Sequence, residues 1–565
     1  MTPLKRLEAI LLQERSLKEL LILASSIGLL FIICQFKPSF ILGYSDHWKY
    51  GVEDFQQHLI GYRYFIQEKW HFPIFEINNY RYPIGTNIIY TDSIPALAIF
   101  GKLFRILLPK NFHPFGLWFT FCFIAQAVCL TLIVFKLGQK NYLATLAVSI
   151  FGIFSPILLD RYRHISLCSH FIILLALYLY LELRDRKDIH KWKWLFFSLV
   201  LFSLFIHIFL FLITFGVFLA ALFQNYNNHP ETAKEPLGFI LLSIFILAGI
   251  MFFTGHIGWG HIYRIGEGFG IYSMNLLSPF LPMDGSLFLK TPIIDPSHGQ
   301  RAEGYNYLGL GLILLLVFNL VFCRKHIRVI YKKNTYLFWI ALLFIILAIS
   351  NKIYFLNFRV LDIPISYPIF NFIHQFRSSG RFYWLAHYII LISLVLLALR
   401  YAPQKYKVWV LVIAAFIQFL DTIPLQARLR NATRWNEKEI ENTPFLNKAR
   451  SKEWENAITK HQFLEIYPTW FCHQDDQYRW LNVSFQALAA KHNIPQNSAY
   501  IARMHTDCEK EKQYVEQLSP NKKAMYLFIG PQYNLEKVKK RLPGFTCHVD
   551  KDVFACSTSP EVFRE

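Results

Sequence analysis

Charged residues are scarce in this chain. They make up 17% of its 565 residues, whereas soluble domains average about 25%. Acidic residues are the rarer kind, because 38 Asp and Glu stand against 58 Lys and Arg and leave a formal net charge of +20. Hydrophobic residues make up 54%, including 54 Phe, and they come in long blocks. This composition excludes a soluble enzyme and a disordered chain, and the blocks predict a membrane protein.

The sequence also lacks the spacings that mark nucleotide and metal sites. Its Gly-rich run, His256 to Gly270, has no phosphate-loop spacing and is therefore not interpreted as a nucleotide site. The glycines of this run predict a mobile loop that closes over a substrate. Five cysteines lie in or beside apolar blocks without metal-ligand spacing, namely Cys34, Cys122, Cys129, Cys168 and Cys323. Excess positive charge in a membrane protein usually lies in cytoplasmic loops, so the net charge does not indicate nucleic-acid binding.

A membrane-spanning helix needs about 20 apolar residues, and the blocks predict an all-α polytopic bundle of about eleven such helices. The predicted spans are 19–36, 114–136, 142–159, 168–184, 193–207, 208–223, 237–254, 306–323, 335–350, 382–399 and 407–421. Residues 193–223 are also long enough for one tilted helix. We prefer two helices that turn at His207, because a single helix would place the later basic gaps outside.

The Lys and Arg residues between the spans set the predicted orientation. The first span follows basic residues and has no small-residue cleavage site after it, so we expect it to be retained with a cytoplasmic N-terminus. Four basic gaps then fall on the cytoplasmic side, at 136–140, 184–191, 324–333 and 400–407. The outer face receives the loops 37–113, 255–305 and 351–381. The predicted domains are a membrane domain, 1–421, and an external domain, 422–565.

The external domain alternates β-type runs with helix-like stretches, which predicts a small α/β domain. The runs are Phe463–Tyr467, Ala499–Arg503, Ala524–Ile529 and Phe545–Ala555, and the helical stretches are 478–492, 507–518 and 535–542. Cys547 and Cys556 flank a turn, so in a hairpin they would face one another and form a disulfide in an oxidising compartment. The pairing of Cys472 and Cys508 is left open.

The first outer loop carries a polar helix face. One face of this predicted helix is apolar, with Phe55, Leu59, Tyr62 and Ile66, and another face bears Asp54, Gln57, His58 and Gly61. Such a helix would lie flat on the membrane surface, with Asp54 and His58 one turn apart. The pair predicts either a general base or metal ligand acting on a lipid-borne substrate, or a solvated polar face.

Seven motifs in this order resemble the GT-C superfamily of polytopic glycosyltransferases and, within it, a bacterial inner-membrane protein family of unknown function. They are Glu53-Asp54-Phe-Gln-Gln-His58, Tyr82-Pro-Ile-Gly-Thr86, Thr91-Asp92-Ser93, Arg163-His-Ile-Ser-Leu167 with His170, Tyr272-Ser-Met-Asn-Leu276, Glu303-Gly-Tyr-Asn-Tyr-Leu-Gly309 and Arg377-Ser-Ser-Gly-Arg381. The resemblance implies transfer of a sugar from a polyprenyl-phosphate donor to a glycan, lipid or protein acceptor on the periplasmic face of the inner membrane.

In that superfamily an acid in the first loop activates the acceptor, and by motif position the role falls on Asp54. Glu53 is a lesser candidate, because on a helix it points about 100° away. Asp92 has three interpretations. It is a second acid, or a ligand with Asp54 and His58 for a divalent cation such as Mg²⁺ or Mn²⁺, or, like Ser93, a cap for the next helix.

The leaving phosphate needs a cationic partner. Four candidates lie at the outer ends of predicted spans, where a guanidinium can hold phosphate with two hydrogen bonds, namely Arg163, His164, Arg377 and Arg381. Weaker alternatives are Arg63, Arg81 and Arg264, and each Arg has the alternative of snorkelling to lipid headgroups. Gln57, His58, His170 and Glu303 are further candidates for contact with substrate, although a lone His at a span end is more often structural.

A transporter or flippase of lipid-linked saccharides is the main alternative function. Transporters place charged groups near the bilayer midplane and contain paired broken helices. In this sequence the informative polar residues cluster at outer helix ends instead. A membrane-anchored scaffold that binds cell-wall polymer would need one span only.

Orientation is directly testable. Alkaline phosphatase, which folds only outside the cytoplasm, should be active when fused after Thr422 and inactive when inserted within 324–333, because the Lys and Arg distribution places these positions on opposite sides. Activity of the second fusion alone would contradict the predicted topology and, with it, the placement of the candidate site.

Overall fold

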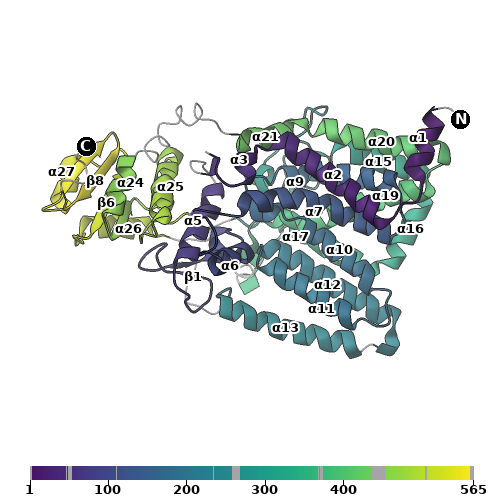
Figure 1. Cartoon of the computed structure of the whole chain (residues 1–565), viewed down its shortest axis with the longest axis horizontal. Coiled ribbons are helices and arrows are strands. Elements are labelled where there is room, and N and C mark those ends of the chain that lie inside the picture. The colour runs from purple at the N-terminus through teal and green to yellow at the C-terminus, as the bar shows by residue number, and fades with distance from the viewer. Residues whose placement is uncertain are drawn as a thin grey trace. The chain divides into compact units, whose positions relative to one another are not determined.

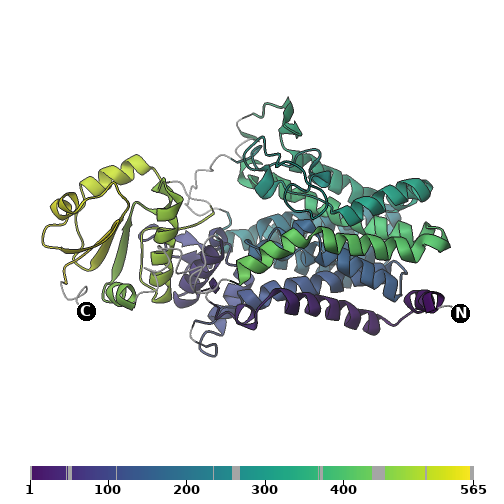
Figure 2. The same ribbon diagram turned by 90° about the horizontal axis from the view of Figure 1, so that it is seen from above.

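A computed structural model describes the chain except residues 1–2, 46, 49–53, 110, 233, 258–267, 367, 370–372, 435–451, 503–505 and 560–565. The described chain is mostly helical (Figures 1 and 2). Its internal contacts divide it into two units, which we call the helical unit (1–37, 117–246 and 267–432) and the mixed unit (38–116, 247–266 and 433–565). The mixed unit therefore joins the loop at 38–116 to the C-terminal segment. The predicted domain boundary at residue 422 places these two segments in different domains.

Among the described residues, sixteen elements in or bordering the helical unit are α-helices. They are α1 (Pro3–Leu12), α2 (Leu17–Gln35), α7 (Phe115–Lys136), α8 (Tyr142–Ile153), α9 (Pro156–Leu159), α10 (Phe171–Leu183), α11 (His190–Leu204), α12 (Ile208–Asn228), α13 (Lys234–Thr254), α14 (Gln300–Glu303), α15 (Leu310–Phe322), α16 (Arg324–Lys333), α17 (Thr335–Ile349), α19 (Trp384–Tyr401), α20 (Gln404–Asp421) and α21 (Ile423–Thr433). Helices α10, α11 and α12 lie side by side (Figure 1).

Polar residues between the apolar blocks set where helices begin. Ser16 and Glu19 form a capping box at the start of α2, and Asn141 caps α8. The connections include the short helices η2 (Ile165–Cys168), η4 (Ser278–Phe280) and η6 (Ser379–Tyr383), and a hairpin of β3 (Lys352–Phe355) and β4 (Phe358–Asp362).

Several helices could span a membrane, which indicates a membrane protein. Among the described residues, six helices are long and apolar enough, or eight if each of two bent pairs, α15 with α16 and α20 with α21, is one span. The predicted count of about eleven is wrong because three blocks form shorter helices. The block 142–159 breaks before Pro156, whose ring removes a backbone N–H. Helices α11 and α17 have 15 residues each, and α17 ends at Ile349, directly before Ser350, where φ is 66°.

The stretch 193–223 forms two helices, as we preferred. Helix α11 ends at Leu204, and α12 begins after His207. The ring Nδ1 of His207 accepts a hydrogen bond from the backbone N–H of Phe209 at 3.2 Å and so caps α12. The predicted turn at His207 is confirmed.

The mixed unit combines helices with small sheets. Its first-loop elements are α3 (Pro38–Ile41), α5 (Asp54–Gln67), β1 (Glu76–Ile77), β2 (Thr86–Asn87), η1 (Ile88–Thr91) and α6 (Pro95–Leu103). Its C-terminal elements are α24 (Lys452–Thr459), β5 (Phe463–Tyr467), η7 (Trp470–Cys472), α25 (Asp476–Lys491), α26 (Cys508–Glu516), β6 (Ala524–Ile529), α27 (Leu535–Arg541), β7 (Thr546–Asp550) and β8 (Val553–Ser557).

The C-terminal strands form a four-stranded sheet in the order β5-β6-β8-β7, with helices on both faces (Figure 2). Strands β5 and β6 are parallel, and the other pairs are antiparallel. Alternate residues of the fully buried β6 point to opposite faces. Met525 packs with α24 and α25 on one face, whereas Tyr526 packs with α26 and α27 on the other.

The predicted α/β character of the C-terminal segment is confirmed, with one correction. Two predicted runs are β5 and β6, and Phe545–Ala555 forms the hairpin of β7 and β8. Ala499–Arg503 is not a strand in its described part, 499–502, and Arg503 lies outside the described residues. The reason is that its backbone bonds to the first loop instead, with Ala502 N–H donating to the carbonyl of Tyr90 at 2.7 Å.

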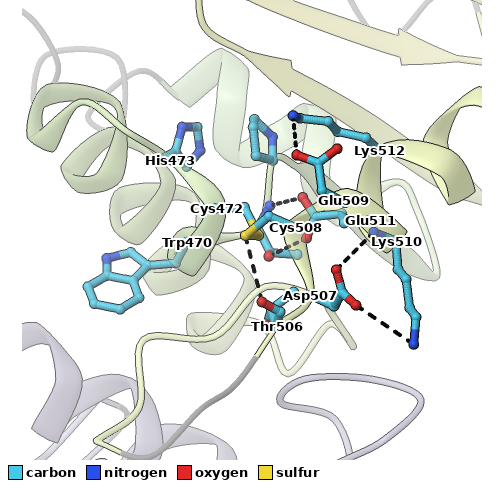
Figure 3. The surroundings of a disulfide bond; sticks show 12 residues. Trp470, Cys472, His473, Thr506, Asp507, Cys508, Glu509, Lys510, Glu511 and Lys512 are labelled. Atoms are coloured by element: carbon cyan, nitrogen blue, oxygen red, sulfur yellow. Dashed lines mark hydrogen bonds and ion pairs between the residues drawn. A yellow bond between two sulfur atoms is a disulfide. The ribbon is translucent and has the colours of Figure 1, made fainter. Parts of the chain in front are cut away.

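Two disulfides link the C-terminal elements. Cys547 and Cys556 face one another in the register of β7 and β8 and are bonded, as their hairpin placement predicts. Cys472 at the end of η7 is bonded to Cys508 at the start of α26, across a sequence separation of 36 residues (Figure 3). The other five cysteines are free thiols, of which Cys34 alone is exposed.

The two disulfides should stabilise the C-terminal segment unequally. Replacing Cys472 and Cys508 by Ala should lower the free energy of unfolding by about 4 kcal/mol, against about 3 kcal/mol for Cys547 and Cys556, because cross-linking a longer loop removes more entropy from the unfolded chain. Both losses of unfolding free energy are measured by unfolding the full-length protein in urea, with limited proteolysis of the C-terminal segment as the readout. A larger loss from the second pair would contradict this account, and Cys34→Ala is the control.

Candidate functional site

Helix α5 carries the predicted catalytic acid, Asp54, at its first residue. The residues that follow, from Phe55 to Tyr62, are all buried. Of the two interpretations of the polar face, a solvated face is therefore wrong for Gln57 and His58.

The polar face of α5 is covered by the turn at 91–93. Gly61 allows the close approach, because a Cβ at this position would lie 2.1 Å from the Oγ1 of Thr91. The hydroxyl of Ser93 donates to the carbonyl of His58 at 2.7 Å, and the hydroxyls of Thr91 and Ser93 lie 2.7 Å apart. Two of the motifs therefore pack directly against each other.

His58 is a neutral, internal residue. Its Nδ1 lies 2.5 Å from the backbone carbonyl of Asp54, so this nitrogen carries the proton and donates. Its Nε2 has no hydrogen-bond partner among the described residues. Burial lowers the pKa of His58 against the opposing effect of the bond to the Asp54 carbonyl. His58 is thus a poor partner for phosphate.

Asp92 does not cap the next helix. It ends η1 with a φ of 53°, and the residue that precedes α6 is Ile94, which makes no side-chain cap. The described residues also contain no group of three His, Cys, Asp or Glu that could hold a metal ion, so they offer no support for the set of Asp54, His58 and Asp92. Asp92 stays a candidate acid.

The carboxylate of Asp54 contacts the C-terminal segment. The hydroxyl of Tyr500 donates to Asp54 Oδ1. The two residues are 446 positions apart, and no sequence signal connects them, so this contact was not predicted. Tyr500 lies in the irregular run that the sequence predicts as a strand.

Further bonds hold the C-terminal segment on the first loop. Gln496 donates its backbone N–H to the carbonyl of Asn79 at 3.0 Å and accepts from Tyr82 N–H at 2.7 Å. The hydroxyl of Tyr64 in α5 donates to the carbonyl of Ile494 at 2.7 Å. The environment of Asp54 is therefore built from two segments that are distant in sequence.

The other predicted residues of the mixed unit differ in burial and backbone conformation. Arg63 is half-buried, and burial lowers its pKa to about 10. Arg81 has a left-handed backbone with φ of 66°. Glu53, Arg264 and most of the Gly-rich run lie outside the described residues.

In the helical unit, Glu303 lies at the centre of a buried ion cluster. Its carboxylate accepts two hydrogen bonds from Arg381, at 2.7 and 2.6 Å, and one from Arg161 at 2.7 Å. His164 Nε2 lies 3.6 Å from the same carboxylate. The side chains of Glu303, Arg381 and Arg161 are only 11%, 9% and 4% exposed. Arg161 also bonds to the carboxylate of Asp160.

The charges of this cluster control the protonation of Glu303. Burial alone would raise its pKa, but the charges of Arg381 and Arg161 outweigh burial and hold the pKa of Glu303 well below its usual value. Glu303 is therefore an ionised anchor for two guanidinium groups and a weak base.

Two glycines bring the motifs of this cluster together. A Cβ at Gly304 would lie 2.0 Å from the carbonyl oxygen of Ser273, and a Cβ at Gly380 would lie 2.6 Å from the Cα of Gly304. The backbones beside Glu303 and Arg381 can therefore touch, and their side chains meet. Asn306 supports the junction by donating to the carbonyl of Gly380 at 3.0 Å.

The remaining predicted residues of the helical unit differ in exposure. Arg163 is exposed, with its Nε donating to the hydroxyl of Tyr162 at 3.0 Å, and Arg377 is exposed. His170 is buried, and its Nδ1 lies 2.8 Å from the hydroxyl of Tyr388. His170 is thus part of the internal packing of the bundle, which agrees with the interpretation that a lone His at a span end is structural.

Arg161 is the residue of the cluster that sequence reasoning missed. It follows Asp160 directly at the end of an apolar block. An acidic residue directly before this arginine is a signal for a buried ion pair, because charged residues are almost never fully buried unless they are paired.

Two protein-family models match the chain. Residues 25–423 match a model described as a domain of unknown function, DUF6311, and residues 453–558 match the DUF6311 C-terminal domain. The chain belongs to the DUF6311 family. Comparison with curated proteins gives no match. Asp54 and Glu303 lie in the first matched segment and Tyr500 in the second, so the bond between Tyr500 and Asp54 joins the two parts of the family pattern.

The Glu303 cluster yields a stability prediction with a matched control. Glu303→Gln should lower the free energy of unfolding by about 3–5 kcal/mol, because it removes the carboxylate that pairs with the buried guanidinium of Arg381 and one of the two carboxylates that pair with Arg161. Asp284 also bridges two arginines, Arg301 and Arg428, but its side chain is 39% exposed. Asp284→Asn should therefore cost about 1 kcal/mol or less. Equal losses in denaturant unfolding would contradict the assignment.

The same variant has a defined pH dependence. The pKa of Glu303 is lower in the folded protein than in the unfolded chain. The ionised carboxylate therefore makes its full contribution to the free energy of unfolding above the ordinary carboxyl pKa of about 4.3, and this contribution is lost as pH falls toward the folded pKa. The stability difference between wild type and Glu303→Gln should thus be constant from pH 7 to about pH 5 and shrink only in stronger acid.

Proposed function

We propose that the protein transfers a sugar from a polyprenyl-phosphate donor to an acceptor on the periplasmic face of a bacterial inner membrane. The observation that carries the proposal is the position of Asp54. It begins a helix of the first loop that follows an apolar span, and its carboxylate accepts a hydrogen bond from the hydroxyl of Tyr500. The resemblance of the ordered motifs to GT-C glycosyltransferases supports the same function.

In the proposed reaction Asp54 is the general base. Its carboxylate takes the proton of an acceptor hydroxyl while the acceptor oxygen forms a bond to the anomeric carbon of the sugar. The bond from that carbon to the phosphate oxygen breaks, and polyprenyl phosphate leaves with the electron pair. A single displacement of this kind inverts the anomeric configuration.

The structure changes which cations we propose for the leaving phosphate. Arg381 is bonded to Glu303, so its proposed role is to hold the cluster together. Arg163 and Arg377 are exposed, and His164 is partly exposed beside Glu303. We therefore propose Arg163, His164 and Arg377 for contact with phosphate. Glu303 is not proposed as a base, because its pKa is depressed.

The test compares two aspartates that each begin a helix. Asp54 is the first residue of α5, and Asp476 is the first residue of α25 on the surface. Asp54→Asn should lower sugar transfer by about 10²- to 10⁴-fold, because general-base catalysis typically contributes this much. Asp476→Asn should leave transfer unchanged.

The assay uses the purified full-length protein in lipid vesicles. The donors are undecaprenyl phosphates that carry radiolabelled glucose, mannose or galactose, and the acceptors are membranes from cells that lack this chain. Near-normal transfer by Asp54→Asn would make Asp54 structural and leave Asp92 as the next candidate. Movement of label across the bilayer without a new glycosidic bond would favour a flippase instead.

A further inference from the structure

Tyr500 touches the carboxylate on which the proposed function depends. We propose that Tyr500 is a positioning residue for Asp54, and that the C-terminal segment is thereby part of the transfer site rather than a separate binding module. The inference rests on the proposed function for its catalytic meaning, whereas the contact itself rests on the structure alone.

The ring of Tyr500 is held by two tryptophans. Trp470 lies against it with ring centroids 4.4 Å apart and planes inclined at 31°. Trp480 meets it edge to face, with centroids 5.9 Å apart and planes at 82°. Aromatic pairs of this geometry contribute beyond their buried area and restrict the rotation of the ring. The hydroxyl of Tyr500 therefore has a defined direction.

The backbone of Tyr500 is fixed from the first loop. Its N–H donates to the hydroxyl of Tyr80 at 2.8 Å and to Gln486 Oε1 at 3.1 Å. Tyr80 is fully buried and stacks on Tyr64 of α5, with ring centroids 5.2 Å apart. Contacts thus run from α5 through Tyr64, Tyr80 and Tyr500 and return to α5 at Asp54. A closed circuit of this kind fixes the carboxylate relative to its own helix.

The disulfide in Figure 3 helps to fix Trp470, one of the two tryptophans that hold the ring of Tyr500. Trp470 begins η7, and Cys472 at the end of η7 is bonded to Cys508. Figure 3 shows the indole of Trp470 directed away from the disulfide. The backbone N–H of Trp470 also donates to the hydroxyl of Ser498 at 2.9 Å. Trp470 is therefore fixed where it contacts Tyr500.

The chemical consequence concerns the direction of the carboxylate. A hydroxyl that donates to Oδ1 restrains rotation of the carboxylate and so fixes where its lone pairs point. A general base must meet the acceptor hydroxyl in hydrogen-bond geometry, and small misplacements of reacting groups cost large factors in rate. The phenol is neutral, so its hydrogen bond orients the carboxylate without adding a charge beside it.

The experiment removes one hydroxyl and leaves the ring in place. Tyr500→Phe keeps the contacts with Trp470 and Trp480 but loses the bond to Asp54. The matched control is Tyr478→Phe, because Tyr478 donates to the carboxylate of Asp552 at 3.0 Å in the same C-terminal segment. Both variants are made in the full-length protein and compared in thermal unfolding, which should be similar.

The contact is tested first, without any activity measurement. Carbodiimide with glycine ethyl ester labels accessible carboxylates, and mass spectrometry of the peptides reports each site. Tyr500→Phe should raise the labelling rate of Asp54 several-fold and leave Asp552 unchanged, whereas Tyr478→Phe should do the reverse. An unchanged labelling rate of Asp54 would overturn the inference.

The positioning role is tested next with the undecaprenyl-phosphate sugars. Tyr500→Phe should lower kcat by about ten- to a hundredfold, the scale of one hydrogen bond to a charged group, and leave the KM for donor near that of wild type. Tyr478→Phe should leave both constants unchanged.

The outcomes separate the two proposals. Normal kcat in Tyr500→Phe together with loss of transfer in Asp54→Asn would overturn the positioning role and keep the proposed function. Normal transfer in Asp54→Asn, or no transfer by the wild type from any of the three donors, would overturn the proposed function and the positioning role with it.

Discussion

A carboxylate that is wholly or partly withdrawn from water needs hydrogen-bond donors, and in each unit of the protein one such carboxylate bonds to residues distant in sequence. In the helical unit, Glu303 meets this need with Arg381 and Arg161, and the glycines at 304 and 380 let the backbones that carry these side chains touch. In the mixed unit, Asp54 meets it with the hydroxyl of Tyr500. Each carboxylate therefore ties together segments that are distant in sequence, and each lies within a motif of the ordered set.

The donors around Glu303 decide its protonation. Two guanidinium groups stabilise the ionised form of Glu303 and depress its pKa, so Glu303 has little tendency to accept a proton. Asp54 accepts a hydrogen bond from the neutral phenol of Tyr500. The charges around Glu303 therefore argue against Glu303 as a base and give it the role of fixing Arg381 and Arg161. The proposal of Asp54 as the base rests on its place in the first loop and on the family resemblance.

Local patterns in the sequence predicted local structure well. Strands β5 and β6, the hairpin with Cys547 and Cys556, and the turn at His207 all depend on residues close in sequence. Long-range contacts were not predictable in this way. The polar face of α5 is buried because the turn at 91–93 covers it, and the run at 499–502 is irregular because its backbone bonds to Tyr80 and Tyr90. Hydropathy overcounts the spans because it does not register helix breaks such as those at Pro156 and Ser350.

The central claim is that Asp54 acts as a general base in a single displacement at the anomeric carbon. The most direct measurement is the anomeric configuration of the product, determined by NMR after transfer from an undecaprenyl-phosphate sugar of known configuration. The account predicts inversion, because the acceptor oxygen attacks opposite the leaving phosphate. A product of retained configuration would contradict it, because retention requires a covalent glycosyl intermediate or another mechanism in which Asp54 does not act as proposed.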